Sequence, residues 1–192
     1  MLKTNLLFFI GVIVSCVSLL QGCATNAQGM ISKRLDIDTM NSKLGTKTDN
    51  LADGGMCPGT KSLIIVNTQD RKDQYCINEV LGGCRWYIIP KEFNEEVVSY
   101  IGKRLVASNV TVGAGSNLAV SLEKLKSQEG VWSFGSNAEL KIHLPDINYT
   151  KTYVAENGSG LGDLAAAYAI HLAIDDFFKD PVFQNYLRCT KK

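Results

Sequence analysis

The sequence predicts an α+β fold: a two-layer sandwich in which a mainly antiparallel sheet packs against two helices. Residues 138–144 alternate apolar and polar side chains, the pattern of a strand with one face in a core and the other in water. Residues 90–109 and 161–179 repeat apolar side chains at intervals of three and four, as amphipathic helices do. Short, hairpin-length links join the strands between these helices, and this order favours an α+β arrangement.

Two short strands and a helix open the predicted domain. Residues 63–66 form a continuous apolar run, which is typical of a buried strand. A second strand is expected at 85–89, because Pro90 follows a run of aromatic and aliphatic side chains there. Proline is tolerated in the first turn of a helix, so helix 90–109 is expected to begin at Pro90 and to end at Asn109.

Further strands and a second helix complete the domain. Residues 110–112 form a short strand that stops at a Gly-rich turn, and residues 118–122 alternate before the clearer strand at 138–144. An extended path is expected beyond that strand. The helix at 161–179 is rich in alanine, so it can lie close against the sheet.

The first 22 residues have the order of a secretory signal peptide. Lys3 is their only charge, and the uncharged, largely apolar run at 6–20 is shorter than the roughly 20 residues that a membrane-spanning helix needs. The run leads to Gly22 and then Cys23, so the segment resembles a bacterial lipoprotein signal, in which the Cys is cleaved free and acylated. A plain cleavable signal, with Cys23 unmodified, is the alternative.

The same resemblance implies a cellular location. Ala24 follows the Cys, whereas an Asp there favours retention in the inner membrane of enterobacteria. The chain is therefore expected at the bacterial outer membrane, facing the periplasm, with the inner membrane as the alternative. Lipoproteins of this type carry several acyl chains, palmitate among them, and two or more chains anchor a protein stably.

One domain is expected after a long polar segment. Residues 23–61 contain no aromatic side chain and many small polar ones, so they predict a lipidated N-terminus and a flexible tether. Residues 62–192 predict a periplasmic α+β domain, long enough to bury a core. The partial helical spacing of Ile31, Leu35 and Met40 leaves a second interpretation open, in which this stretch docks on the domain or on a partner.

The cysteines predict two disulfides. One cysteine leaves with the signal and Cys23 carries lipid, so those that remain are Cys57, Cys76, Cys84 and Cys189. An even number in an oxidising periplasm favours disulfides. The preferred pairs are Cys76–Cys84, which closes a short loop, and Cys57–Cys189, which ties the ends of the domain together; the other two pairings stay open. A zinc site is the alternative, but no C-x-x-C pair occurs, so no metal is expected.

Composition and motifs give no positive sign of catalysis. The chain has 20 basic and 19 acidic side chains, and removal of Lys3 with the signal leaves no net charge. This balance argues against nucleic-acid binding. The Gly-rich loops at 113–116 and 158–162 lack the spacing of nucleotide-binding loops, so no cofactor is expected. His143 and His171 have no neighbouring nucleophile and no G-x-S-x-G motif occurs, so no enzyme activity is expected.

Four aromatic residues suggest a contact surface. Trp86 and Tyr87 lie in the second predicted strand, and Trp132 and Phe134 fall on one side of an extended segment between two glycines. Packing in the core or at a sheet edge explains such residues in many proteins. The alternative is an aromatic patch that contacts a protein partner.

From about residue 62 to 187, the order of elements after a lipoprotein signal resembles the YajG-like lipoproteins and the related auxiliary lipoproteins of ABC-type transport. These families share an early strand, a helix, a run of strands and a closing helix. The resemblance implies a small periplasmic α+β domain with a non-enzymatic role, as an interaction component or helper of a cell-envelope transport or assembly complex.

Two other functions stay open. A lipoprotein that binds lipid or a small apolar ligand needs an apolar pocket between the final helix and the sheet. A structural subunit of an outer-membrane secretion or flagellar machine would bind its neighbours through sheet edges. The expected partners are therefore the membrane, through the acyl chains, and envelope proteins.

Overall fold

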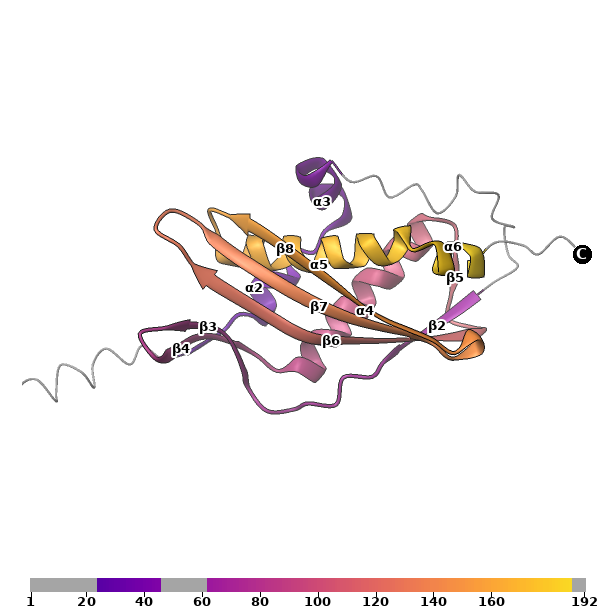
Figure 1. Ribbon diagram of the computed structural model, residues 1–192, viewed down its shortest axis with the longest axis horizontal. Coiled ribbons are helices and arrows are strands. Elements are labelled where there is room, and N and C mark those ends of the chain that lie inside the picture. Colours follow the sequence, from indigo (N-terminus) through magenta and orange to yellow (C-terminus); the bar gives the residue numbers. More distant parts are fainter. Residues whose placement is uncertain (1–23, 46–61, 188–192) are drawn as a thin grey trace, which may run out of the picture.

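The predicted α+β class is confirmed by the computed structural model, which describes residues 24–45 and 62–187 (Figure 1). The larger sheet has the strand order β5-β2-β6-β7-β8, with strands Thr111–Val112, Ser62–Asn67, Ser116–Glu129, Phe134–Leu144 and Tyr149–Ser159. The smaller sheet has the order β1-β4-β3, with strands Thr25–Asn26, Gly83–Ile88 and Tyr75–Val80. The helices are α2 (Gln28–Ser32), α3 (Ile37–Leu44), α4 (Pro90–Ala107), α5 (Gly162–Lys179) and α6 (Pro181–Leu187), and a short 3₁₀ turn, η2, spans Pro145–Ile147.

The larger sheet is mostly antiparallel, as predicted, because β6, β7 and β8 form a meander. Its parallel part is β2, which pairs with both β5 and β6. Helix α4 lies on the path from β2 to β6, as a crossover between parallel strands requires. The strand predicted at 118–122 is the first part of the much longer β6, and β3 was not predicted at all.

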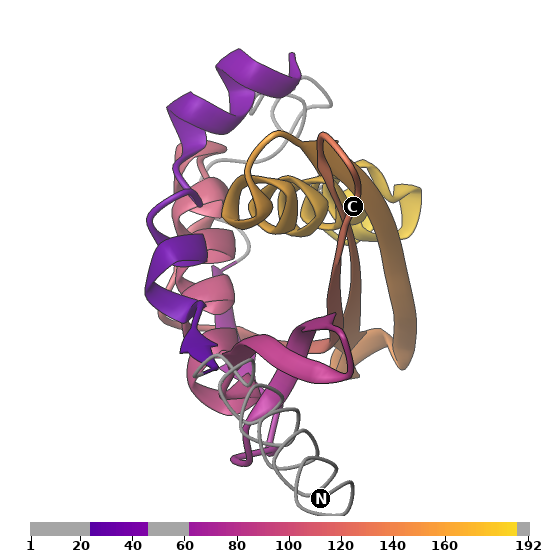
Figure 2. The same ribbon diagram turned by 90° about the vertical axis from the view of Figure 1, so that its left-hand side faces the viewer.

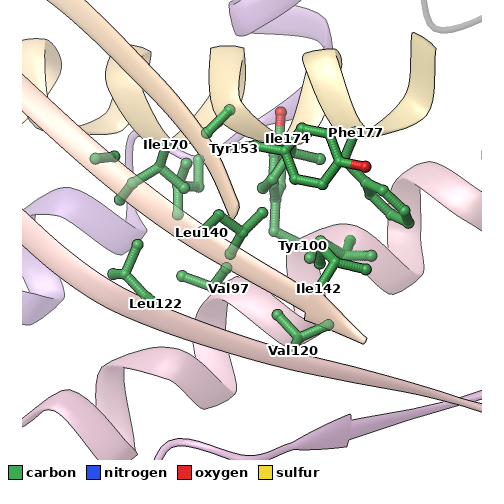
Figure 3. Packing of buried hydrophobic residues seen from close by; sticks show 14 of the residues in the cluster. Val97, Tyr100, Val120, Leu122, Leu140, Ile142, Tyr153, Ile170, Ile174 and Phe177 are labelled. Atoms are coloured by element: carbon green, nitrogen blue, oxygen red, sulfur yellow. The ribbon is translucent and has the colours of Figure 1, made fainter. Parts of the chain in front are cut away.

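Helices α4 and α5 pack on the same face of the larger sheet (Figures 1 and 2). Side chains from both helices and from β6, β7 and β8 interdigitate there (Figure 3); they are Val97, Tyr100, Val120, Leu122, Leu140, Ile142, Tyr153, Ile170, Ile174 and Phe177. All ten are buried. The alanines of α5 are buried as well, so this helix lies close to the strands, as its composition predicted.

The N-terminal segment adds a further layer, because α2 and α3 lie on the outer side of α4 and α5 (Figure 2). Ile31, Leu35 and Met40 are buried in the common core. Over residues 24–45 this packing agrees with the alternative in which the stretch docks on the domain; the rest of the tether predicted for residues 23–61 lies outside the described residues. The physical reason is the helical spacing of these apolar side chains, which gives the segment one face to bury.

The ends of α3 are well defined. The side chain of Asp36 accepts a hydrogen bond from the backbone N–H of Thr39 at 2.9 Å and so caps the first turn. Gly45 follows the last turn with a φ of 64°, the left-handed conformation that commonly ends a helix. These two residues are the sequence signal that would have identified the helix.

A hairpin made of β3 and β4 covers the edge of β6 beyond the point where β2 ends. Asn78 of β3 is buried, and its side-chain amide donates to the backbone carbonyl of Ser127 in β6 at 3.1 Å. The predicted disulfide between Cys76 and Cys84 is confirmed, with a Cα–Cα distance of 5.7 Å, and it crosses this hairpin. Cys23, Cys57 and Cys189 lie outside the described residues, so the second predicted pair stays a prediction.

Candidate functional site: the hairpin end

Two hairpin turns and the first described residues of the chain lie at the same end of the domain (Figure 1). We call this region the hairpin end and define it as β1, the β3–β4 turn at 81–82, the β6–β7 turn at 130–133 and the first turn of α5. Strand β1 joins it because Thr25 pairs with Trp86 of β4. Figure 2 faces this end of the domain.

Trp86 and Phe134 hold the hairpin end together. Their rings stack with centroids 5.5 Å apart and planes inclined by 24°. Both rings lie over Gly162 at the start of α5, where an added Cβ would come within 2.2 Å of Trp86 and 3.0 Å of Phe134. Both residues are half-buried. Their geometry therefore gives them a packing role in joining β4, β7 and α5.

Tyr87 anchors the N-terminal segment through its backbone. It pairs with Asn26 of β1, and its carbonyl oxygen accepts a hydrogen bond from the N–H of Ala27 at 2.9 Å. Its side chain is half-buried. Of the four aromatic residues predicted to contact a partner, Trp86, Tyr87 and Phe134 are thus part of the internal architecture of this end.

Trp132 is different, since its side chain is 92% exposed in the β6–β7 turn. The adjacent Val131 is 86% exposed, and Leu81 at the tip of the β3–β4 hairpin is 97% exposed. The next most exposed large apolar side chain among the described residues, Val106, is only 60% exposed. These three residues, which we call the apolar tips, have no counterpart elsewhere in the described part of the chain.

Leu81 also has an unusual backbone conformation. Leu81 and Gly82 form a two-residue turn with φ values of 51° and 78°, because Val80 pairs with Gly83. Turns with positive φ at both positions favour Asn or Gly at the first one, and a bulky side chain is rare there. Sequence reasoning missed Leu81; the signal was a leucine where this turn favours asparagine.

Ion pairs tie the elements of the hairpin end to one another. Arg34 contacts Asp163 of α5 at 2.8 Å, and Lys126 of β6 contacts Glu79 of β3 at 3.5 Å. A further pair joins Arg85 of β4 to Glu129 at the end of β6. The charges at this end are therefore largely balanced within the domain, and the apolar tips are its distinctive feature.

A second group of candidate side chains lies between α4 and α5 and is buried except for Lys179. The hydroxyl of Tyr100 lies 2.6 Å from Nδ1 of His171, which is 0% exposed. Arg104 donates to the carboxylate of Asp175 at 2.9 Å, and Lys179 contacts the same carboxylate at 2.5 Å. The guanidinium of Arg104 also lies over the ring of Phe178. We call this group the interhelix cluster.

Burial sets the protonation of the interhelix cluster. It lowers the pKa of His171 to about 4, helped by the positive charge of Arg104, so the imidazole is neutral near pH 7. Burial raises the pKa of Tyr100 well above its usual value. Burial acts to raise the pKa of Asp175, but hydrogen bonds from Lys179 and Arg104 outweigh it and the pKa is lowered. The interface between α4 and α5 therefore holds a neutral His171 and an Asp175 whose charge is paired.

His143 and Asp180 also have structural partners. His143 is partly exposed on the outer face of the sheet, with Nδ1 2.8 Å from the hydroxyl of Thr150. The carboxylate of Asp180 accepts a hydrogen bond from Lys151 at 2.6 Å. It also accepts one at 2.8 Å from the N–H of Val182, in the first turn of α6. Burial opposes ionisation of Asp180, yet these hydrogen bonds and two from tyrosines lower its pKa to about 2.

The outer face of the larger sheet carries a shallow hollow of about 380 Å³. Its floor is Gly135 of β7 and Gly158 of β8, which pair across the strands and have no side chains to fill it. Lys126, Asn137 and Glu156 form its walls, and the amide of Asn137 donates to Glu156 at 2.8 Å. The hollow is polar and open, and it adjoins the hairpin end.

Within residues 24–45 and 62–187, no helix is long and apolar enough to cross a membrane. In the same part of the chain, no group of three His, Cys, Asp or Glu side chains is arranged to hold a metal ion. No protein-family model, curated protein or solved structure matches this chain.

Proposed function

We propose that this chain is a lipoprotein of the bacterial outer membrane, attached through an acylated Cys23 and facing the periplasm. Its domain acts as a non-enzymatic interaction component or helper of a cell-envelope transport or assembly complex. The observation that carries the proposal is the side of the larger sheet that no described helix covers. Helices α4 and α5 pack on one face, whereas the other face and the edge strand β8 carry polar and exposed side chains.

Strand β8 is suited to bind a protein segment. It is 11 residues long and stands at the end of the strand order, with β7 as its partner. An edge strand presents backbone N–H and C=O groups on its outer side, and a strand from another protein can pair with them. Val154, Thr152 and Glu156 alternate with core positions along β8 and are exposed, so they would contact such a partner from the outer face.

The position of the titratable side chains supports a non-enzymatic role. His171 and Asp175 are buried between two helices and contact Tyr100 and Arg104 through hydrogen bonds. A general base must reach the proton that it abstracts, directly or through one water. Neither residue has such access from the surface.

The packing of α5 also distinguishes this role from that of a lipid carrier. The alanines of α5 lie against β7, and Leu140 and Ile142 on that strand are 0% exposed. Close packing of this kind leaves the interface between the helix and the sheet filled by side chains. Binding of a lipid or a small apolar ligand remains the alternative, and the experiment below separates the two.

The test is recovery of bound partners from membranes. The full chain, extracted in mild detergent after crosslinking, is expected to bring down protein partners in fixed stoichiometry. The Val154→Lys variant should lose them, because a lysine on the outer face of β8 disturbs docking. Val106→Lys, on the exposed side of α4, is the matched control and should retain them. Recovery of monomer with bound lipid as the sole ligand would instead support the lipid carrier.

The anchor has its own test. Cys23→Ser removes the acylated residue, so the variant is expected to leave the outer-membrane fraction. Retention of this variant in the membrane at the level of the unmodified chain would contradict attachment through Cys23.

A further inference from the structure

We propose that the hairpin end rests on the bilayer surface, with Leu81, Val131 and Trp132 inserted at the boundary between lipid headgroups and acyl chains. This inference rests on the proposed attachment through Cys23. It adds an orientation: the domain lies directly on the membrane and is not held away from it by a tether.

The first argument is the length of chain between the anchor and the domain. Ala24 alone separates Cys23 from Thr25, which already pairs with Trp86 in the smaller sheet. Two residue steps span at most about 7 Å, since each covers at most 3.3–3.6 Å. An acylated Cys23 would therefore hold Thr25, the β1 residue of the hairpin end, within about 7 Å of the lipid-modified cysteine. Residues 46–61 follow β1 in the sequence, so they add no length to the link between the anchor at Cys23 and β1.

The second argument is the distribution of exposed apolar side chains. Leu81, Val131 and Trp132 are the three most exposed large apolar residues of the described chain, and all lie on turns at this end. The turn of the β3–β4 hairpin and that of the β6–β7 hairpin both lie at the end where the chain emerges from β1 (Figures 1 and 2). Tryptophan is enriched at membrane interfaces because it has an apolar body and one polar N–H.

The third argument is the conformation of Leu81. Its φ of 51° costs stability that an asparagine at this place would not cost. No contact with another described residue offsets the cost, because the side chain is 97% exposed. Strained residues of this kind concentrate where the surroundings use them. Contact with lipid would give the exposed leucine the burial that the domain does not provide.

The fourth argument is rigidity. The Cys76–Cys84 disulfide crosses the β3–β4 hairpin, and the Trp86–Phe134 stack joins that hairpin to β7. The Arg85–Glu129 pair links β4 to the strand that carries the other turn. The apolar tips are thus presented together, so insertion of both costs little additional ordering.

The fluorescence of the two tryptophans provides the test, because Trp86 and Trp132 are the only ones in the chain. The full acylated chain is reconstituted in vesicles of phosphatidylethanolamine and phosphatidylglycerol that contain lipids brominated near the headgroup. The Trp86→Phe variant reports on Trp132, and we expect at least twofold quenching with emission shifted to shorter wavelength. The Trp132→Phe variant reports on the stacked Trp86 and should be quenched much less.

A control tryptophan at the other end of the domain tests whether anchoring alone causes quenching. Val106 is exposed in the last turn of α4, and this turn leads to β5 at the end opposite the hairpins (Figure 1). Val106→Trp in a background with both native tryptophans changed to Phe should show no quenching. If Trp86→Phe does not fold, the difference between the spectra of the unmodified chain and Trp132→Phe gives the Trp132 signal.

The outcomes separate the inference from the function on which it rests. If the chain does not sediment with the vesicles, attachment through Cys23 fails. If it sediments but Trp132 emits as in water and is not quenched, the inference is overturned. Protection of Trp132 in native membranes but not in pure lipid also overturns it, and would assign the apolar tips to a protein partner.

Discussion

The interhelix cluster and the hairpin end differ in which side chains they bury: the first buries charged and titratable groups, and the second exposes large apolar ones. Between α4 and α5, Arg104, His171 and Asp175 are buried, and the carboxylate of Asp175 pairs with Arg104 and with the exposed Lys179. At the hairpin end, large apolar side chains are exposed, and no described residue covers Leu81 or Trp132. The first arrangement pairs its charges within the fold, whereas the second leaves apolar surface in water unless something outside the domain covers it.

The largest expected effect concerns the interhelix cluster. Arg104→Ala removes the buried partner of Asp175 and should lower the free energy of unfolding by about 3–5 kcal/mol, because it leaves a buried carboxylate with Lys179 alone. Urea unfolding measures this loss. The matched double variant, Arg104→Met with Asp175→Leu, replaces the pair by apolar side chains and should recover most of the stability. A loss below about 1 kcal/mol for Arg104→Ala would show that the cluster is not a unit of stability.

The pH dependence tests the same region. The folded pKa of His171, about 4, lies below its ordinary value of 6.5, so the unfolded chain binds more protons in that interval. The stability from a neutral His171 is fully present above pH 6.5 and is lost as the pH falls toward 4. The expected loss is about 3 kcal/mol, at 1.36 kcal/mol per pKa unit.

The comparison variant for this prediction is His171→Gln, which cannot titrate. Urea unfolding at intervals between pH 7 and 4.5 should show a smaller slope for the variant than for the unmodified chain. Equal slopes would mean that groups other than His171 dominate the pH dependence of stability. The charged and titratable groups that face His171 are Tyr100, Arg104, Asp175 and Lys179.

A smaller effect is expected at the support of the hairpin end. Gly162→Ala places a methyl group where Trp86 now lies and should cost about 1–3 kcal/mol through overpacking. It should also change the near-ultraviolet circular dichroism of the Trp86–Phe134 stack. Gly135→Ala is the control, because no atom lies within 4 Å of its added Cβ. Similar losses for both variants would contradict the role of the stack.

The smallest effect has the opposite sign. Leu81→Asn removes an apolar tip and relieves the positive φ, so it should stabilise the isolated domain by about 1 kcal/mol while reducing contact with lipid. Val131→Asn, at a residue without positive φ, should leave stability nearly unchanged. Thermal unfolding in detergent-free buffer, beside quenching of Trp132 in vesicles, separates the two effects. Destabilisation by Leu81→Asn would show that the leucine serves the fold itself.

Sequence reasoning succeeded where one periodicity continues through an element. Helix α4 and helix α5 begin within one residue of their predicted starts, and the alternation at 138–144 lies within β7. It failed where the pattern is interrupted. In β6 the register shifts between Leu122 and Lys124, so the buried positions change phase and the second half of the strand has no simple alternation with the first.

Two further features depend on tertiary contacts that no local pattern contains. Strand β3 was missed because Asn78 is buried and polar, with its amide nitrogen donating to a carbonyl in β6. The apolar tips could be predicted only in part: the sequence singled out Trp132 as aromatic, but its exposure follows from its place in a turn. The packing of Ile31 and Met40 could have been predicted from their helical spacing together with the capping residues Asp36 and Gly45.

The length of β6 has a consequence for how far the domain extends. Its 14 residues, at about 3.3 Å each, make a strand of roughly 45 Å that starts beside β2 and ends at the hairpin end. If that end rests on lipid, the length of β6 sets the greatest height that the opposite end of the domain reaches above the bilayer. Envelope components that meet η2 or the start of β8 would then do so as much as four to five nanometres above the bilayer, while those that meet Val154, midway along β8, would do so closer to it.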